Sequence, residues 1–292
     1  MVSGGGLAEV LNPAERFWAV DKIILAYFTL MCVLIAAYWS RVPGAAELLA
    51  LHVAGAALVV LAVKWPGWAS RIFHHWYPLL YVAFCYREMS ILIPAIRRTD
   101  ADQELAKLDY ALWHANPTVW LERIQAPPLT EFLQIVYSLF IPAVLFVALR
   151  FWMRKDYAAF RYYAFLIATG FLVSYLGYLI VPARGPRFLL KDLQHVPLRG
   201  LWLFGLLQST LDQLEHVTYD CFPSGHTELA ILACWGSRQI SRGFGSLYLV
   251  YTVCMVFATV YLRYHYTVDV AAGALLALVL IFATPALYRK LS

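Results

Sequence analysis

The sequence has few charged residues. Only 14% of its 292 residues are Asp, Glu, Lys or Arg, whereas 62% are hydrophobic, and the mean hydropathy is +0.64. This shortage of charge excludes an ordinary soluble domain and indicates a protein that crosses a membrane several times. The net charge of +5 is modest and falls mainly in loops. No block of like charges occurs, so neither a nucleic-acid partner nor a charged tail is expected.

Paired cysteines and a cleavable leader are also lacking. The sequence contains five cysteines but no CxxC pair, and four of them lie in apolar runs, where cysteine behaves as a small hydrophobe. No disulfide framework is therefore expected. The first twenty residues lack the basic start, apolar core and small-residue cleavage site of a secretory signal, so the first apolar run is expected to direct its own insertion. The cysteines are Cys32, Cys85, Cys221, Cys234 and Cys254.

Long apolar runs take up most of the chain. The runs are continuously apolar, which excludes the alternating pattern of an outer-membrane barrel. Each is close to the length needed to cross the hydrocarbon core. We therefore expect an all-α, polytopic membrane helix bundle with about eight transmembrane helices. The predicted helices are 21–39, 46–63, 76–96, 131–150, 160–182, 224–240, 244–262 and 266–288.

Lys and Arg are distributed unevenly over the short loops. The even-numbered loops and the C-terminus carry most of them, whereas the first loop carries only Arg41. Because cytoplasmic loops are enriched in Lys and Arg, we place both termini in the cytoplasm and the third, fifth and seventh loops outside. We expect a multi-pass protein of a plasma membrane or a bacterial-type inner membrane. The basic residues of the cytoplasmic side are Lys64, Arg71, Arg150, Arg154, Lys155, Arg161, Arg238, Arg242, Arg289 and Lys290.

Two long outer loops contain amphipathic segments. Residues 97–130 include LDYALW and NPTVWLERI, which are expected to lie on the membrane surface. Residues 200–216 place four leucines on one helical face and polar residues on another. Such a helix either connects two spans or forms a lid or lateral wall for a lipid substrate, and amphipathicity does not separate these two interpretations. The leucines are Leu203, Leu207, Leu211 and Leu214.

Three polar motifs lie at helix ends on the outer side. VPARGPRF ends the fifth predicted span, CFPSGHT begins the sixth, and YLRYHYTVDV joins the seventh to the eighth. Neighbouring loops of a helix bundle can bring such motifs together, so we expect them to form one site. The candidate residues are Arg184, Arg187, Ser224, Gly225, His226, Arg263, His265 and Asp269.

The residue types in these motifs suit a phosphate group. Arginine side chains bind phosphate oxygens with paired hydrogen bonds, and Ser224-Gly225 at a helix start offers backbone N–H groups and the positive dipole end. If the last helix begins before His265, Asp269 shares its face and fixes the imidazole tautomer. His226 is then available as a general acid. Ser224 alone would be a plain helix cap, but the cluster as a whole predicts a phosphate site.

The order of an Arg-Pro-containing motif, PSGH and HxxxD resembles the type-2 phosphatidic acid phosphatase superfamily of membrane lipid phosphatases and phosphotransferases. The resemblance covers roughly residues 131–288. It divides the chain into an N-terminal membrane extension, 1–130, with three helices and an interfacial loop, and a catalytic core, 131–292, built on six helices. It implies hydrolysis of a lipid phosphate at the outer face of the bilayer through a phosphohistidine, without a metal or another cofactor.

The resemblance also implies a role for each matching residue. His265 would attack phosphorus and become the phosphohistidine, and Asp269 would orient it. His226 would protonate the leaving oxygen. Ser224 and the Gly225 N–H would hold phosphate oxygens.

Two motifs depart from the family pattern. The first motif usually reads Lys, six residues, Arg-Pro, whereas here Arg184-Gly-Pro-Arg187 precedes Phe188, so Arg184 or Arg187 would replace the usual basic residues. In the third motif, the usual arginine position is Thr259, and the nearest arginine is Arg263. RYHYTVDV is more similar to the inositol-phosphorylceramide-synthase and sphingomyelin-synthase branch. Transfer of a phospho-headgroup to a lipid alcohol is therefore the alternative to hydrolysis.

Other interpretations of the motifs are weaker. His226, His265 and Asp269 could ligate a metal, but the nearby arginines would repel a cation. A serine hydrolase would leave the arginines unexplained and would need a nucleophile elbow. A transporter would place broken helices at mid-membrane, whereas these motifs lie at helix ends.

Arg87 and Glu88 are charged residues inside the third predicted span. Adjacent residues of a helix point about 100° apart, so the two need separate partners. An interhelical ion pair and recognition of a headgroup both remain open. The sequence does not indicate the lipid or the oligomeric state.

Overall fold

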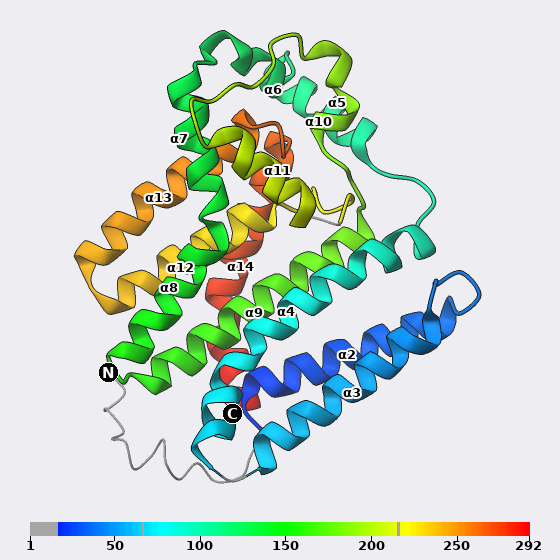
Figure 1. Cartoon of the computed structure of the whole chain (residues 1–292), viewed down its shortest axis with the longest axis vertical. Helices are drawn as coiled ribbons and strands as arrows, with labels where there is room; N and C mark the ends of the chain where they lie inside the picture. Colours follow the sequence, from blue (N-terminus) through cyan, green and yellow to red (C-terminus); the bar gives the residue numbers. More distant parts are fainter. Residues whose placement is uncertain (1–16, 66, 215–216) are drawn as a thin grey trace.

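The computed structural model describes residues 17–65, 67–214 and 217–292, and its framework is helical (Figure 1). The long helices are α2 (Ala19–Ala37), α3 (Ala45–Lys64), α4 (Trp68–Ile96), α9 (Tyr157–Ile180), α13 (Arg242–Tyr261) and α14 (Thr267–Leu291). The shorter ones are α5 (Asp102–Trp113), α6 (Pro117–Trp120), η1 (Leu121–Ile124), α7 (Pro127–Ser138), α8 (Phe140–Met153), α10 (Pro186–Leu189), η2 (Lys191–Leu193), α11 (Phe204–Leu214) and α12 (Gly225–Ile240). The prediction of an all-α membrane bundle is confirmed.

The number of full membrane crossings differs from the predicted eight. Within the described residues, the six long helices are long and apolar enough to cross a membrane. The fourth predicted span is a pair, α7 and α8, which bends by 49° and would make a seventh crossing if it acts as one. Pro142 explains the break, because it has no N–H to donate to the carbonyl of Ser138 and its ring crowds that carbonyl. The sixth predicted span is α12, which has only 16 residues, fewer than the ~20 that cross a bilayer.

Helix α4 begins at Trp68, before the predicted start at residue 76. The sequence there is rich in histidine and aromatic residues, and α2 supplies their partner. Asp21 is fully buried, its Oδ2 lies 2.9 Å from His74 Nε2, and the Tyr77 hydroxyl donates a hydrogen bond to its Oδ1. This buried cluster ties α2 to α4 and accounts for the earlier start of α4.

Helix α9 is the most buried of the candidate membrane spans. It packs against α4 on one side and against α8, α12 and α14 on others, as Figure 1 shows for the neighbouring α4 and α9 ribbons. Glycine allows two close approaches around the loop before α12. A Cβ at Gly177 of α9 would lie 2.3 Å from Pro223 Cδ, and one at Gly273 of α14 would lie 2.3 Å from the Ser224 carbonyl oxygen. The loop is therefore held between α9 and α14.

The amphipathic segment predicted over residues 200–216 forms α11, with residues 215–216 lying outside the described part. Glu131 of α7 caps it from another helix, since its carboxylate accepts hydrogen bonds from the N–H groups of Leu201, Leu203 and Phe204. Leu211 lines a cavity beside His226. Helix α11 therefore contributes to the wall of that cavity.

Glu88 in α4 has an interhelical partner. Its Oε2 lies 2.9 Å from Nε2 of His52 in α3, and both side chains are buried. Arg87, by contrast, is exposed. The interhelical-pair interpretation therefore holds for Glu88, and this pair joins α3 to α4 within the membrane.

We expect Glu88→Ala to lower the free energy of unfolding by about 1–3 kcal/mol, because it leaves His52 buried without its carboxylate. Thermal unfolding of the purified protein in detergent measures this change. Arg87→Ala is the matched control and should leave the midpoint unchanged. Equal midpoints for Glu88→Ala and the wild type would show that the pair does not stabilise the bundle.

Candidate active site

The three polar motifs meet at one end of the bundle. They come from the end of α9, the loop before α12 and the turn between α13 and α14. Backbone hydrogen bonds join them. The Cys221 N–H donates to the Ala183 carbonyl at 3.0 Å, the Ser224 N–H to the Asp269 carbonyl at 3.1 Å, and the Arg187 N–H to the Arg263 carbonyl at 3.1 Å. The expected convergence of the motifs is therefore seen in the backbone.

The two histidines of these motifs are in contact. His265 Nε2 lies 3.4 Å from His226 Nδ1. The His226 ring stacks on Tyr137 with a centroid separation of 4.5 Å and lies equally close to Phe140. The first turn of α12 carries His226, so the positive end of this helix lies beside both imidazoles. The aromatic side chains on either side of the α7–α8 break thus hold His226 in place.

His265 is oriented differently from the prediction. Helix α14 begins at Thr267, after His265, so His265 and Asp269 do not share a helical face. Asp269 caps the helix by accepting the Tyr266 N–H at 2.8 Å, and its Oδ2 lies 3.6 Å from His265 Nδ1. The nearer partner of that nitrogen is the Cys221 carbonyl, at 2.8 Å. Because a carbonyl only accepts, Nδ1 carries the proton and Nε2 keeps its lone pair for His226 or a substrate.

Cys221 is a site residue that sequence reasoning missed. Its Sγ lies 2.8 Å from Asp269 Oδ2 and 3.4 Å from the Tyr264 carbonyl oxygen. Burial raises the pKa of the Cys221 thiol, so the thiol stays protonated and donates to the carboxylate. Cys221 thus contacts Asp269 through its side chain and His265 through its backbone. Its position two residues before Pro223 of the PSGH motif was the available signal, but the sequence does not show the contact.

The ligand atoms of Cys221, His265 and Asp269 lie within 4.8 Å of one another, and they form the candidate metal group among the described residues. Cys221 takes the place that the sequence analysis gave to His226 in such a group. Thiol, imidazole and carboxylate together suit zinc. In this structure the same atoms are engaged with each other, since the thiol donates to the carboxylate.

Ser224 and Gly225 form the start of α12. Ser224 is fully buried, and its Oγ accepts the Thr227 N–H at 3.3 Å and donates to Thr227 Oγ1 at 3.0 Å. A Cβ at Gly225 would lie 2.5 Å from the Tyr178 hydroxyl, so only glycine fits there. The Ser224 hydroxyl therefore caps the helix, and both residues set the position of His226.

The three arginines occupy different places. The Arg187 guanidinium lies 4.9 Å from the centroid of Tyr264, and the Tyr264 ring stacks on Tyr137 beside the histidines. Arg184 is exposed and lies over Phe188 at 4.8 Å. Arg187 is thus linked to the histidine pair through Tyr264 and Tyr137, and its Nη1 also lies 3.3 Å from Asp212 Oδ1.

Arg263 is bound to η1 and to the segment between η2 and α11. Its Nη2 lies 2.9 Å from Glu122 Oε1 and 2.5 Å from the Val196 carbonyl oxygen. The side chain is buried, and its guanidinium ties the α13–α14 turn to the segments that contain Glu122 and Val196. The structure therefore brings together His226, His265, Asp269 and Arg187, and it engages Arg263 elsewhere.

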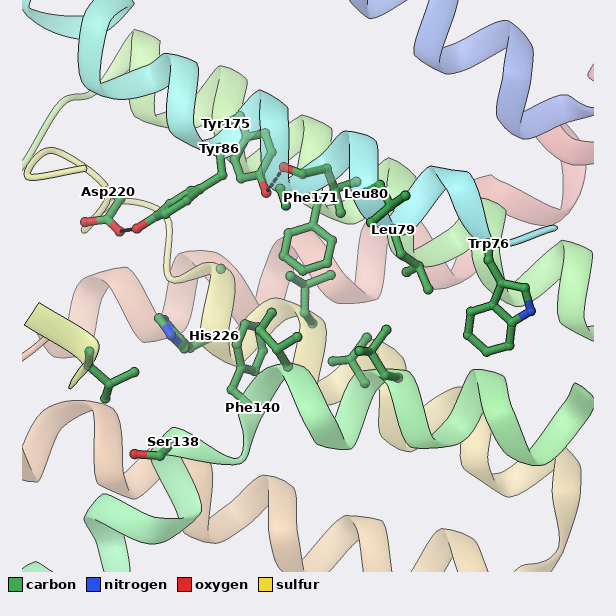
Figure 2. Close-up of a pocket in the computed structure, with 18 of the residues that line it drawn as sticks. Trp76, Leu79, Leu80, Tyr86, Ser138, Phe140, Phe171, Tyr175, Asp220 and His226 are labelled. Carbon is green, nitrogen blue, oxygen red and sulfur yellow. Dashed lines mark hydrogen bonds between the residues drawn. The ribbon is translucent and has the colours of Figure 1, made fainter. Parts of the chain in front are cut away.

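A cavity of about 600 Å³ opens beside His226 (Figure 2). Asp220 and Tyr86 lie at the same end as His226, and the Tyr86 hydroxyl donates to Asp220 Oδ2 at 2.6 Å. Burial raises the pKa of Asp220, although the Tyr86 hydrogen bond and the nearby His265 and Arg187 oppose the rise. Asp220 was not among the predicted site residues, since an acidic residue beside a phosphate site has no sequence signature.

Comparison with known proteins agrees with this geometry. A family profile of the PAP2 superfamily matches residues 103–283, which begins ahead of the predicted core boundary at 131. A PA-phosphatase related-family protein of Dictyostelium discoideum is 32% identical over 110 residues, which are 37% of this chain and 20% of that protein. This chain thus matches about a fifth of the length of that relative. No solved structure matches the chain. Because the profile spans more than half of the chain and includes both histidines, the chain belongs to the PAP2 superfamily.

Proposed function

We propose that the protein is an integral-membrane phosphatase that hydrolyses a lipid phosphate through a phosphohistidine at His265. The observation that carries this proposal is the histidine pair, with His265 Nε2 3.4 Å from His226 Nδ1 and His265 Nδ1 held by the Cys221 carbonyl. This arrangement presents one nucleophilic nitrogen next to one proton donor, as two-step phosphate transfer requires. Membership in the PAP2 superfamily supports a phosphatase-type reaction.

The reaction proceeds in two balanced steps. The lone pair of His265 Nε2 attacks phosphorus, the bond from phosphorus to the lipid oxygen breaks, and His226 gives its proton to the leaving oxygen. His226 then takes a proton from water, whose oxygen attacks the phosphohistidine and releases phosphate and free His265. The ring gains positive charge in the first step, and the Asp269 carboxylate, 3.6 Å from Nδ1, stabilises that charge.

The phosphate oxygens need donors that stabilise negative charge. Arg187, which packs on Tyr264, and the N-terminus of α12, with the Gly225 N–H next to His226, are the first choice. Arg184 is exposed beside Arg187 and can complete the set once substrate enters. Ser224 acts through the helix that it caps, and Arg263 through the turn that it anchors. The mechanism uses no metal or other cofactor.

The position of the site in the bundle supports two further parts of the proposal, namely that the substrate is a lipid and that the site faces the outer side of the membrane. The site lies at the end of the bundle opposite to the loops that contain most of the short-loop Lys and Arg residues. By the positive-inside rule, this end faces away from the cytoplasm and both termini lie in the cytoplasm. A phosphate group at the outer membrane surface is then within reach of the histidines.

Transfer of a phospho-headgroup to a lipid alcohol is the second candidate. The observation that favours it is the largely apolar cavity beside His226, which suits a lipid alcohol better than water. The RYHYTVDV motif, similar to the sphingolipid-synthase branch, points the same way. The chemistry at phosphorus is identical, and only the acceptor in the second step differs.

His265→Ala should lower kcat by about 10³-fold and Asp269→Asn by about 10²-fold, because the first removes the nucleophile and the second the charge that stabilises it. The assay follows free phosphate and new phospholipid from labelled phospholipids in detergent with EDTA, with and without a lipid alcohol. His195→Ala changes an exposed histidine and serves as the control. Wild-type turnover by His265→Ala would rule out the phosphohistidine.

The products and EDTA separate the alternatives. Free phosphate that depends on His265 indicates hydrolysis, and a new phospholipid that needs the alcohol indicates transfer. Loss of all activity in EDTA would contradict the metal-free mechanism and would favour a metal at Cys221, His265 and Asp269.

Cys221→Ala should lower kcat about tenfold with KM nearly unchanged, because the thiol's hydrogen bond to Asp269 is lost while the backbone contact with His265 remains. Cys221→Ser keeps a donor and should restore most of the activity. Steady-state kinetics of the two variants on one lipid phosphate measures this difference. Equal kcat in Cys221→Ala and the wild type would show that the thiol does not position Asp269.

A further inference from the structure

The cavity beside His226 has one wall from α4 and another from α8. The α4 residues that line it include Trp76, Leu80, Ala83 and Tyr86, which recur at about one helical turn and so form one face. Figure 2 shows Trp76 at one end of the cavity and Tyr86, Asp220 and His226 toward the other. The cavity is therefore elongated along α4, with its polar groups gathered at the end that holds the histidine.

The length of the cavity matches the depth of one lipid leaflet. Ten residues separate Trp76 from Tyr86, which corresponds to roughly 15 Å along an α-helix. The hydrocarbon core of a bilayer is about 30 Å thick, so half of it is about the same length. A chain that starts with its phosphate at His226 would end near Trp76.

The walls are open to the membrane at their edges. Leu80 of α4 and Ile141 of α8 both line the cavity, yet they are 64% and 47% exposed. These exposed fractions show that the cavity is not sealed, and an opening between two membrane-spanning segments would face the lipid. A hydrocarbon chain can therefore enter sideways, between α4 and α8, without leaving an apolar environment.

Helix α4 is fixed against the rest of the site. The Tyr175 hydroxyl of α9 donates to the Val82 carbonyl at 3.0 Å, and Tyr86 donates to Asp220 in the loop that precedes Cys221. Helix α4 lies outside the segment that matches the PAP2 superfamily, residues 103–283. The α4 wall is thus formed by residues outside the matched segment.

We propose that this cavity binds one hydrocarbon chain of the lipid substrate, and that the α4 face from Trp76 to Tyr86 sets the chain length that it accepts. The proposal rests on the proposed function for the position of the phosphate at the histidines. The occupant is a single acyl, alkyl or prenyl chain, because the lining beyond Asp220 is largely apolar and the cavity has a volume of about 600 Å³. Ala83 is the small residue of the α4 face, seven residues from Trp76 and three from Tyr86, so a larger side chain there would block the cavity between its two ends.

Photolabelling tests the binding without requiring turnover. The probe is a long-chain alkyl phosphonate with a diazirine at the far end of the chain, which cannot be hydrolysed, and the protein is embedded in phosphatidylcholine nanodiscs. Labelled peptides are mapped by mass spectrometry. We expect label on α4 and α8 near Trp76, competed by the same phosphonate without diazirine. Ala83→Phe should reduce this label about tenfold or more, since the chain can no longer pass the block.

Ala57→Phe is the matched control, because Ala57 is an exposed alanine of α3 outside the cavity lining. It should leave the label unchanged, and equal unfolding midpoints would show that both variants fold. Label spread evenly over the lipid-facing helices, or undiminished by Ala83→Phe, would overturn the chain site. Hydrolysis assays with oleoyl and hexanoyl lysophosphatidate add a second measurement. Ala83→Phe should lower kcat/KM for the oleoyl substrate about tenfold and spare the hexanoyl one, and an equal loss for both would also overturn the proposal.

The two proposals fail separately. If the chain site is correct but the enzyme proposal is wrong, the phosphonate still labels α4 while no lysophosphatidate is hydrolysed. If only the chain site is wrong, hydrolysis depends on His265 and is insensitive to Ala83→Phe.

Discussion

The hydrogen bond from His265 Nδ1 to the Cys221 carbonyl fixes the arrangement on which the rest of the site depends. It joins the α13–α14 turn to the loop before α12, and it leaves Nε2 directed at His226. A second hydrogen bond, from the Ser224 N–H to the Asp269 carbonyl, joins the loop before α12 to the first turn of α14. Two loops that are remote in sequence thus share backbone hydrogen bonds, and such bonds do not depend on the mobility of long side chains. The close approach at Gly177 and Gly273 lets α9 and α14 hold this junction from both sides.

Buried contacts between a histidine and a carboxylate connect the N-terminal helices to one another. Asp21 with His74 joins α2 to α4, and His52 with Glu88 joins α3 to α4. Burial of such groups is tolerated only when they are paired, because an isolated charge in the membrane is costly. Each pair therefore favours one arrangement of α2, α3 and α4. Because Tyr86 reaches Asp220 from α4, the same arrangement extends to the edge of the histidine site.

Local sequence signals were sufficient for the helical bundle and for the expectation that the three motifs form one site. They were not sufficient for the number of crossings, because the fourth predicted span is bent and the sixth is only 16 residues long. The roles of Cys221 and Asp220 were not accessible in this way, because they depend on packing between segments distant in the chain. Cys221 orients His265 through its carbonyl, which every residue has, so its identity carries no signal for that contact. The last helix begins at Thr267, one residue after the predicted start at 266, so the condition that would place His265 and Asp269 on one helical face is not met, and Asp269 caps α14 from within its first turn.

The break between α7 and α8 has a further consequence for His226. Tyr137 and Phe140 lie on opposite sides of this break, and both rings contact His226. Pro142 causes the bend, so the bend is present before any ligand binds. Tyr137 and Phe140 are therefore already in place around His226, and the binding free energy is not reduced by an entropic cost of ordering them.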